Sequence, residues 1–396
     1  MHTLRCVSCG RSHPHNTRAW RCICGGRVTI EDAPLLTSAQ IRTDVHSLWR
    51  YAEALPVHAE TGISLGEGWT PLIPYRNAAR EVLIKLDHLS PSGSYKDRGA
   101  ALLLSRIREL EIERVVEDSS GNAGAAVAAY AAAAGISADI YVPGENSPGK
   151  LAQIRAYGAT LFPVEGSRSD TAAAALRAAQ EHYYASHVWN PYFLEGTKTW
   201  AFEVWEQLGF RAPDTVVLPA GNGTLLIGSY RGFSELRKAG CIDTVPKHVA
   251  VQTAACAPLA ARFNSAKSGE EDYAGSKAGS SAPPAARSSA DQPQKHSRTV
   301  AEGIAIAEPP LMEEMLKAVT TTRGTVLTVG EGEIRRALCD AVRSGLYIEP
   351  TAAAALAGLR QYAQFSPAEE TTVGVVTGHG LKAAEKVAAL TEKEES

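Results

Sequence analysis

The sequence predicts an α/β protein with two doubly wound parallel-sheet domains and a small N-terminal appendage. Three observations lead to this prediction. From residue 82 onward, short apolar runs alternate with alanine-rich helical segments, glycine-containing turns follow several of the runs, and four of the seven cysteines lie within the first 24 residues. Alternating strands and helices form parallel sheets that helices cover on both faces. Ligands of such sheets bind at the carboxyl ends of the strands.

The composition is that of a protein with a sizeable core. The chain has 396 residues, of which 44% are hydrophobic and 21% charged. A net charge of -3 and the lack of a basic tract argue against nucleic acid as the main partner. No apolar run is long enough to cross a membrane, and the N-terminus lacks the apolar core of a signal peptide. We therefore expect a cytoplasmic protein with no membrane partner.

The N-terminal cysteines form two pairs, each followed by glycine, within residues 1–30. Four thiolates can close a tetrahedral structural zinc site, so this appendage is predicted to be a zinc-ribbon-like unit. The alternative is a set of reduced cysteines without metal. His13 and His15 lie between the pairs and are either exposed polar residues or substitute ligands. The predicted ligands are Cys6, Cys9, Cys22 and Cys24.

The elements follow in order along the chain. Residues 39–55 are predicted to be helical, and glycine and proline interrupt the pattern at 65–72. A strand at 82–86, a turn at 90–96 and a helix to about residue 110 come next. Residues 265–298 are rich in Ser, Ala, Gly and Pro, and we expect a disordered surface insertion there. Further strands are predicted at 114–117, 139–142, 160–164, 215–218, 248–252, 325–329 and 372–376.

Lys96 is the first candidate for chemistry. It lies between a small polar turn, Ser90 to Ser94, and a helix with Asp97 in its first turn. An amine in this place is fixed in direction and partly shielded, which suits a lysine that bonds covalently to an aldehyde. The alternative is a solvated loop lysine.

Two strand-to-helix turns are candidate anion sites. Ser119 to Gly124 precedes an alanine-rich helix, whose free amides and dipole would attract a carboxylate or phosphate, and Asn122 adds a neutral donor for a phenolate-like oxygen. Pro219 to Leu226 contains Gly221 and Gly223 and lacks the lysine of a P-loop, which favours a phosphate monoester over a nucleoside triphosphate. The alternative for both is an ordinary capped turn.

Thr377 is predicted to stand at the carboxyl end of the last strand and to point into the same crevice. A hydroxyl there would not force a nearby pyridine nitrogen to stay protonated. His379 lies between two glycines, where a turn residue is the simpler interpretation than a catalytic one.

These motifs, SGSYKDRG, SSGNAG, PAGNG and TGHGLK, resemble in their order the pyridoxal-phosphate enzymes of fold type II, the tryptophan-synthase-β superfamily. The chain is most similar to the threonine synthase family, also through its cysteine ribbon, GEGWTPL and NPYFLEGTKTWAFEVWEQLG. The resemblance implies that Lys96 bonds to the pyridoxal phosphate aldehyde and later moves the substrate α-proton. It further implies that Asn122 binds the 3′-oxygen and that Thr377 meets the pyridine nitrogen. The implied phosphate cradle is Gly221, Asn222, Gly223, Thr224 and Leu225, and the implied carboxylate site is Ser119, Ser120 and Ala123.

Two segments depart from the family. Phe193 stands where threonine synthases have an arginine that is expected to hold the phosphate of O-phosphohomoserine, and a phenyl ring cannot pair with that dianion. Phe193 and the nearby Lys198 are predicted substrate-binding residues, and Arg168 or Arg155 could compensate for the missing arginine. Residues 301–305, AEGIA, look more like serine/threonine dehydratases.

The resemblance implies four units: a zinc-ribbon-like appendage at 1–30, a segment at 31–80 that packs on the large domain, a small domain at 81–190 and a large domain at 191–396. The predicted activity is a pyridoxal-phosphate lyase acting on a hydroxy or phospho amino acid, with conversion of O-phosphohomoserine to threonine as the leading prediction. The alternatives are dehydratase-like β-elimination, β-replacement as in cysteine synthases, and an inactive interaction protein. The oligomeric state is left open, with a homodimer as one option.

Overall fold

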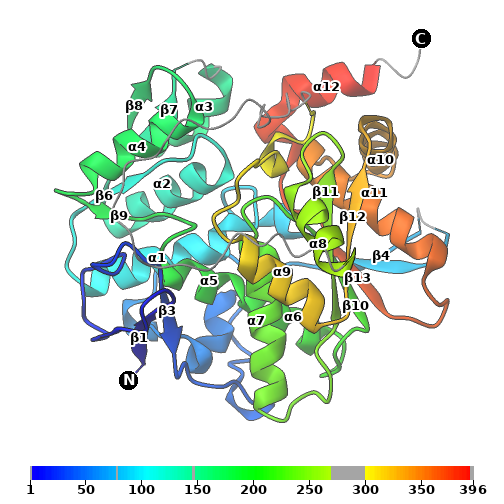
Figure 1. Cartoon of the computed structure of the whole chain (residues 1–396), viewed down its shortest axis with the longest axis horizontal. Coiled ribbons are helices and arrows are strands. Elements are labelled where there is room, and N and C mark those ends of the chain that lie inside the picture. The colour runs from blue at the N-terminus through cyan, green and yellow to red at the C-terminus, as the bar shows by residue number, and fades with distance from the viewer. Residues whose placement is uncertain (1, 77–78, 145–147, 269–298, 393–396) are drawn as a thin grey trace.

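Two sheets of mainly parallel strands and one small antiparallel sheet organise the chain. The computed structural model describes residues 2–76, 79–144, 148–268 and 299–392 (Figure 1). These residues form a six-stranded, a four-stranded and a three-stranded sheet. The parallel sheets confirm the predicted α/β class.

The six-stranded sheet has the strand order β12-β11-β10-β13-β5-β4 and is parallel apart from the edge strand β4. Its central strand β10 is buried over its whole length, as expected for a parallel strand that helices cover on both faces. Its strands are β4 Leu72–Tyr75, β5 Val82–Lys85, β10 Thr215–Pro219, β11 Lys247–Thr253, β12 Thr325–Val329 and β13 Thr372–Val375.

The four-stranded sheet has the order β8-β7-β6-β9, and all its pairs are parallel. Its strands are β6 Arg114–Glu117, β7 Ser137–Pro143, β8 Thr160–Val164 and β9 Tyr183–Tyr184. Helices α2 and α4 pack on β7, and α2 also packs on α1. The helices are α1 Lys96–Glu109, α2 Asn122–Ala134, α3 Pro148–Ala156, α4 Arg168–Ala178, α5 Pro191–Thr197, α6 Thr199–Gln207, α7 Thr224–Lys238, α8 Pro258–Ser268, α9 Met312–Thr321, α10 Glu331–Arg343, α11 Pro350–Phe365 and α12 Ala384–Glu392.

Helices α1 and α5 lie between the two large sheets and touch backbone to backbone (Figure 1). A Cβ at Gly196 would lie 2.0 Å from the carbonyl oxygen of Arg98, and a Cβ at Gly99 would lie 2.4 Å from the Phe193 ring. Because only glycine allows these approaches, the sequence brings Phe193 against the first turn of α1, where Lys96 begins the helix.

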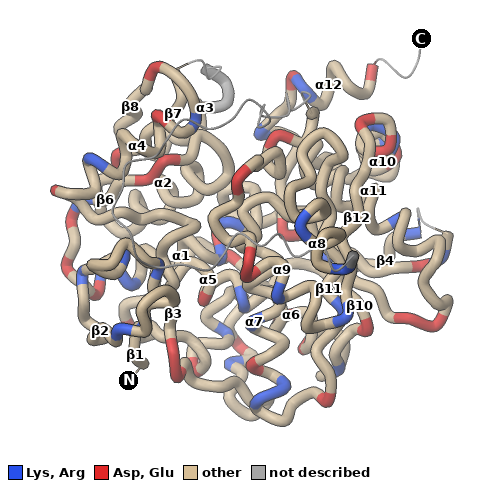
Figure 2. Tube along the Cα trace, in the orientation of Figure 1, with Lys and Arg blue, Asp and Glu red and all other residues tan. Residues whose placement is uncertain are grey.

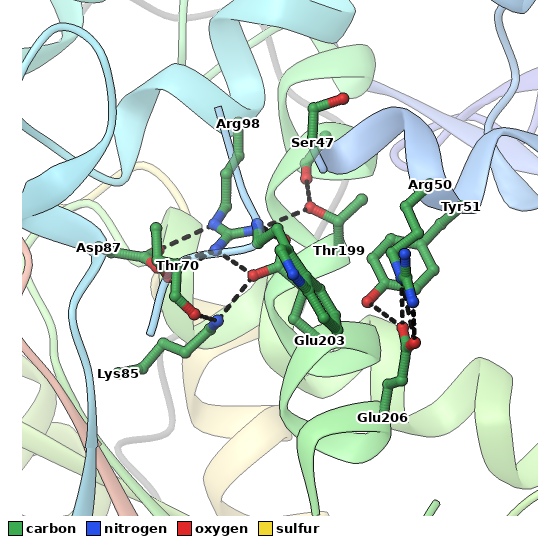
Figure 3. Close-up of polar contacts among 12 residues, drawn as sticks. Ser47, Arg50, Tyr51, Thr70, Lys85, Asp87, Arg98, Thr199, Glu203 and Glu206 are labelled. Atoms are coloured by element: carbon green, nitrogen blue, oxygen red, sulfur yellow. Dashed lines mark hydrogen bonds and ion pairs between the residues drawn. The ribbon is translucent and has the colours of Figure 1, made fainter. Parts of the chain in front are cut away.

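A fully buried ionic network also holds the first turn of α1 (Figure 3). Arg98 donates to both Asp87 and Glu203, and Lys85 Nζ lies 2.8 Å from Glu203 Oε2. All four side chains are 0% exposed. The network joins β5, α1 and α6, so it fixes the start of α1 against the six-stranded sheet. Thr70 extends it by donating to Asp87 at 2.7 Å.

The N-terminal sheet packs on the segment that precedes α5. Its antiparallel strands are β1 Thr3–Cys6, β2 Ser12–His13 and β3 Val28–Glu31. The Trp20 ring meets those of Tyr184 and Trp189 edge to face, at 4.9 and 5.8 Å between centroids. His2 Nε2 is hydrogen-bonded to the Tyr192 hydroxyl at 2.7 Å. The appendage therefore supports the chain from β9 to α5.

The predicted helix at 39–55 was wrong, because this segment forms 3₁₀ turns at Ser38–Gln40 and Leu48–Ala54 instead. The Arg50 guanidinium donates to the carbonyl groups of Arg42, Thr43 and Val45. These side-chain donors satisfy carbonyls that an α-helix would have paired along its own backbone, so an irregular path costs no hydrogen bonds.

Two predicted boundaries also differ. β5 pairs with β13 and so belongs to the six-stranded sheet, although the division at residue 81 placed it in the small domain. Its apolar pattern carries no information about its partner, which lies near the other end of the chain. The predicted insertion at 265–298 begins inside α8, which extends to Ser268, and 269–298 lie outside the described residues.

Charge is distributed over both halves of the molecule. Figure 2 shows Lys and Arg interspersed with Asp and Glu along the described chain. Among the described residues, no helix is both long and apolar enough to cross a bilayer.

Candidate active site

Lys96 lies where the two large sheets meet. It is half-buried at the first position of α1, and its Nζ donates to the Thr224 hydroxyl at 2.9 Å. Thr224 begins α7, directly after β10 and the predicted phosphate loop. The Tyr95 hydroxyl lies 3.0 Å from the same Thr224 oxygen. The structure thus brings the predicted amine to the predicted anion loop, although they are far apart in sequence.

The turn before Lys96 is held from both sides. Buried Asp97 accepts from the backbone N–H of Ser92 at 2.6 Å and also from its hydroxyl. Burial raises the pKa of Asp97 to about 6. Lys382 donates to the Ser92 carbonyl at 2.7 Å, and the N–H of Tyr95 donates to the Thr377 carbonyl at 3.1 Å. The segment after β13 is therefore docked on the Lys96 turn.

The loop at 221–225 is a tight connection to a long helix. Gly223 has a φ of +87°, and a Cβ there would lie 2.5 Å from the Met315 side chain. A Cβ at Gly221 would lie 2.8 Å from the Gly303 carbonyl oxygen. Both positions require glycine, and the free amides at the start of α7 suit an anionic group. Leu225 is buried in the second position of α7, and the Asn222 side chain points to His187, 3.3 Å from its Nε2.

Thr377 supplies a buried hydroxyl to the site. It follows β13, is 2% exposed, and its hydroxyl has no hydrogen-bond partner among the described residues. Buried hydroxyls are rarely left unpaired, which indicates that a bound molecule completes its hydrogen bonding.

Asn122 is the first residue of α2. Its Nδ2 donates to both carboxylate oxygens of Glu349, at 3.0 and 3.1 Å. Glu349 precedes α11 and was not predicted to be part of the site. The Glu-Pro start of that helix was its only signal in the sequence. Ser119, Ser120 and Ala123 lie on the same turn, where Ser119 Oγ accepts from the Gly121 N–H at 3.3 Å.

Phe193 and Lys198 have different surroundings. The Phe193 ring is fully buried in α5, with Lys96 Nζ 5.6 Å from its centroid. Lys198 is also fully buried, but its Nζ lies 2.6 Å from Glu195 and 2.8 Å from Glu235. The prediction that Lys198 binds substrate is thus corrected, because two carboxylates already neutralise its charge. Arg155 and Arg168 are exposed.

Buried Glu117, half-buried Asp118 and buried His187 form a cluster that was not predicted from the sequence. Glu117 ends β6, and its Oε1 lies 2.7 Å from His187 Nδ1. Burial raises the pKa of Glu117 to about 8, and burial together with the charge of Lys96 lowers the pKa of His187. The adjacent carboxylates of Glu117 and Asp118, directly before SSGNAG, were its signal.

The site can bond an aldehyde, hold a phosphate and place a carboxylate at a second helix start. The family described as pyridoxal-phosphate dependent enzyme matches residues 63–378. A threonine synthase of Methanosarcina acetivorans is 33% identical over 397 residues, covering 96% of this chain and 92% of that protein. One of Synechocystis is 34% identical over 84% of this chain and 82% of that protein. Among solved structures, a threonine deaminase of Solanum lycopersicum has a TM-score of 0.66 at 19% identity, covering 91% of each chain.

Proposed function

Because this chain is a lyase of the pyridoxal-phosphate-dependent enzyme family, we propose that it converts O-phosphohomoserine and water to threonine and phosphate. The observation that carries this proposal is the identity of 33% with a threonine synthase over 96% of the chain. A match of this extent covers nearly the whole chain. The motifs around Lys96 support the same assignment.

The residues of the site fit pyridoxal phosphate. The Lys96 amine suits its aldehyde, the amides of 221–225 suit its phosphate, and the unpartnered Thr377 hydroxyl suits its ring nitrogen. Asn122 can donate its second N–H to the 3′-oxygen while it holds Glu349. When bound, this cofactor supplies an electron sink for bonds at the substrate α-carbon.

The protein's own groups have distinct tasks in this proposal. Ser119, Ser120 and Ala123 hold the substrate carboxylate at the start of α2 through backbone amides and hydroxyls. Lys96 then removes the proton from the α-carbon, since its Nζ lies at the cofactor-phosphate loop, 2.9 Å from the Thr224 hydroxyl. The buried Phe193 ring keeps water from one side of the amine.

The assay that tests the substrate measures two products side by side. We expect phosphate release from O-phosphohomoserine, with threonine formed in equal amount, and little keto acid from serine or threonine. Keto acid without phosphate would instead support dehydratase-like elimination. That second candidate is favoured by Phe193, because the site then needs no cation for a phosphate dianion.

Thr224→Val is expected to weaken cofactor binding about tenfold, because it removes a hydroxyl that would bond the phosphate. Fluorescence titration of the cofactor-free protein with pyridoxal phosphate measures this. Thr321→Val, at an exposed position of α9, is the matched control and should bind like wild type. Equal affinity of both variants would contradict the assignment of Thr224.

We also infer that the four N-terminal cysteines bind one structural zinc ion. Their sulfurs lie within 4.8 Å of one another, with 3.5 Å from Cys6 to Cys24 and 3.7 Å from Cys9 to Cys22. Sulfurs at the usual zinc distance in a tetrahedron lie about 3.8 Å apart.

Zinc content tests this inference. Purified protein should contain one zinc per chain by atomic emission, and Cys9→Ser should lose most of it. Its Tm should also fall, because the ribbon supports Tyr184 and Trp189. Cys241→Ser, outside the cluster, should keep the metal, and equal zinc in both variants would exclude the four-cysteine site. A homodimer and a cytoplasmic location stay predictions from the sequence.

A further inference from the structure

We propose that Glu117, Asp118 and His187 bind a divalent cation beside the cofactor-phosphate loop. One ligand atom from each residue lies within 4.8 Å of the others. Glu117 and Asp118 come from the carboxyl end of β6, and His187 comes from the segment that follows β9, the neighbouring strand. Two carboxylate oxygens and one imidazole nitrogen are a ligand set for hard divalent ions such as Mg²⁺ and Mn²⁺.

The cluster contains a buried carboxyl oxygen that the described residues leave unpaired. Glu117 is 0% exposed, and its Oε2 has no hydrogen-bond partner among the described residues. Neither Glu117 nor Asp118 forms an ion pair with Lys or Arg in the part of the chain that the structure describes. A buried carboxylate oxygen without a partner is costly, and a metal ion would satisfy it.

The location of the cluster connects it to the chemistry. His187 Nε2 lies 3.3 Å from Asn222 Nδ2 in the phosphate loop, and the His187 and Phe193 rings lie 5.9 Å apart. A cation here would stand next to the residue that replaces the family's phosphate-binding arginine. Resting on the proposed function, we assign to this cation the positive charge for the substrate phosphate that Phe193 cannot provide.

Binding is tested on the holoenzyme, with Mn²⁺ as the probe because the thiolate cluster favours Zn²⁺. The protein is first treated with EDTA, its zinc content is checked, and free Mn²⁺ is followed by electron paramagnetic resonance during titration. We expect one equivalent to bind. Glu117→Gln and Asp118→Asn should each weaken binding about tenfold or more. Glu113→Gln, the same change at an exposed position next to β6, is the control and should bind like wild type.

The outcomes test separately whether the cation site exists and whether the cation binds the substrate phosphate. Circular dichroism and Tm first confirm that the variants fold. Mn²⁺ binding that is absent, or equal in Glu117→Gln and Glu113→Gln, overturns the site. The assigned role predicts that Mn²⁺ lowers the KM for O-phosphohomoserine in wild type and not in Glu117→Gln. An unchanged KM overturns that role and leaves the site. If no phosphate is released under any condition, the proposed function fails, whereas the binding result stands.

Discussion

Lys96→Ala is expected to reduce turnover about 10³-fold or more, because in the proposed mechanism Lys96 is both the amine that holds the cofactor and the base that moves the substrate α-proton. The visible absorbance of the holoenzyme, which we attribute to the cofactor bonded to Lys96, should disappear as well. Absorbance spectra after reconstitution and stopped assays of phosphate release measure the two effects. The two readouts should change together, since one side chain carries both roles.

The control for this experiment is Lys317→Ala, which removes an exposed lysine from α9. It should keep the spectrum and the rate of wild type. A Lys96→Ala protein that still shows the visible band with added cofactor would refute the assignment, since another amine would then hold the aldehyde. Loss of the band with an unchanged rate would exclude Lys96 as the proton carrier.

Glu203→Gln is expected to lower the free energy of unfolding by about 3–5 kcal/mol, because it leaves Lys85 and Arg98 buried with one carboxylate fewer. Urea unfolding followed by circular dichroism measures this loss. Glu81→Gln removes a carboxylate from an exposed pair with Arg76 and should change stability by less than about 1 kcal/mol. Similar losses in both variants would show that the buried network contributes no more than a surface pair.

The stability difference between wild type and Glu203→Gln should depend on pH. Burial alone would raise the pKa of Glu203, but the charges of Arg98 and Lys85 hold it at about 2. A carboxyl whose pKa is lower in the folded state stabilises the protein above its unfolded pKa, near 4.5, and loses this effect as the pH falls toward 2. The stability gap between wild type and Glu203→Gln should therefore be complete at pH 7 and shrink below about pH 4.5.

Local patterns in the sequence were sufficient for most strands of the two large sheets, though not for β4 and β9, and for the loops that carry backbone amides. The runs at 114–117, 160–164 and 325–329 coincide with β6, β8 and β12, because each is a short β-branched segment between turns. Gly221 and Gly223 were predictable for a similar reason, since the conformation of a tight strand-to-helix turn depends mainly on its own residues.

Contacts between distant segments could not be predicted in this way. Lys198 looked like a free cation near the site, yet its partner Glu235 comes from another helix. Glu349 reaches Asn122, and His187 reaches Glu117, only because the folded chain places separate strand ends together. A single sequence shows which residues can ionise, but it does not show which of them neutralise one another.

The pairing of β5 with β13 also bears on the order in which the protein folds during synthesis. Leu83 pairs with Val373, so the strand that leads to Lys96 must wait for nearly the whole chain to leave the ribosome. The four-stranded sheet, by contrast, lies within residues 114–184 and can form early. Contacts of such long sequence separation slow folding. Assembly of the Lys96 turn against Thr377 is thus a late event, and chains that stop before residue 372 should lack a catalytic centre even where the smaller sheet is native.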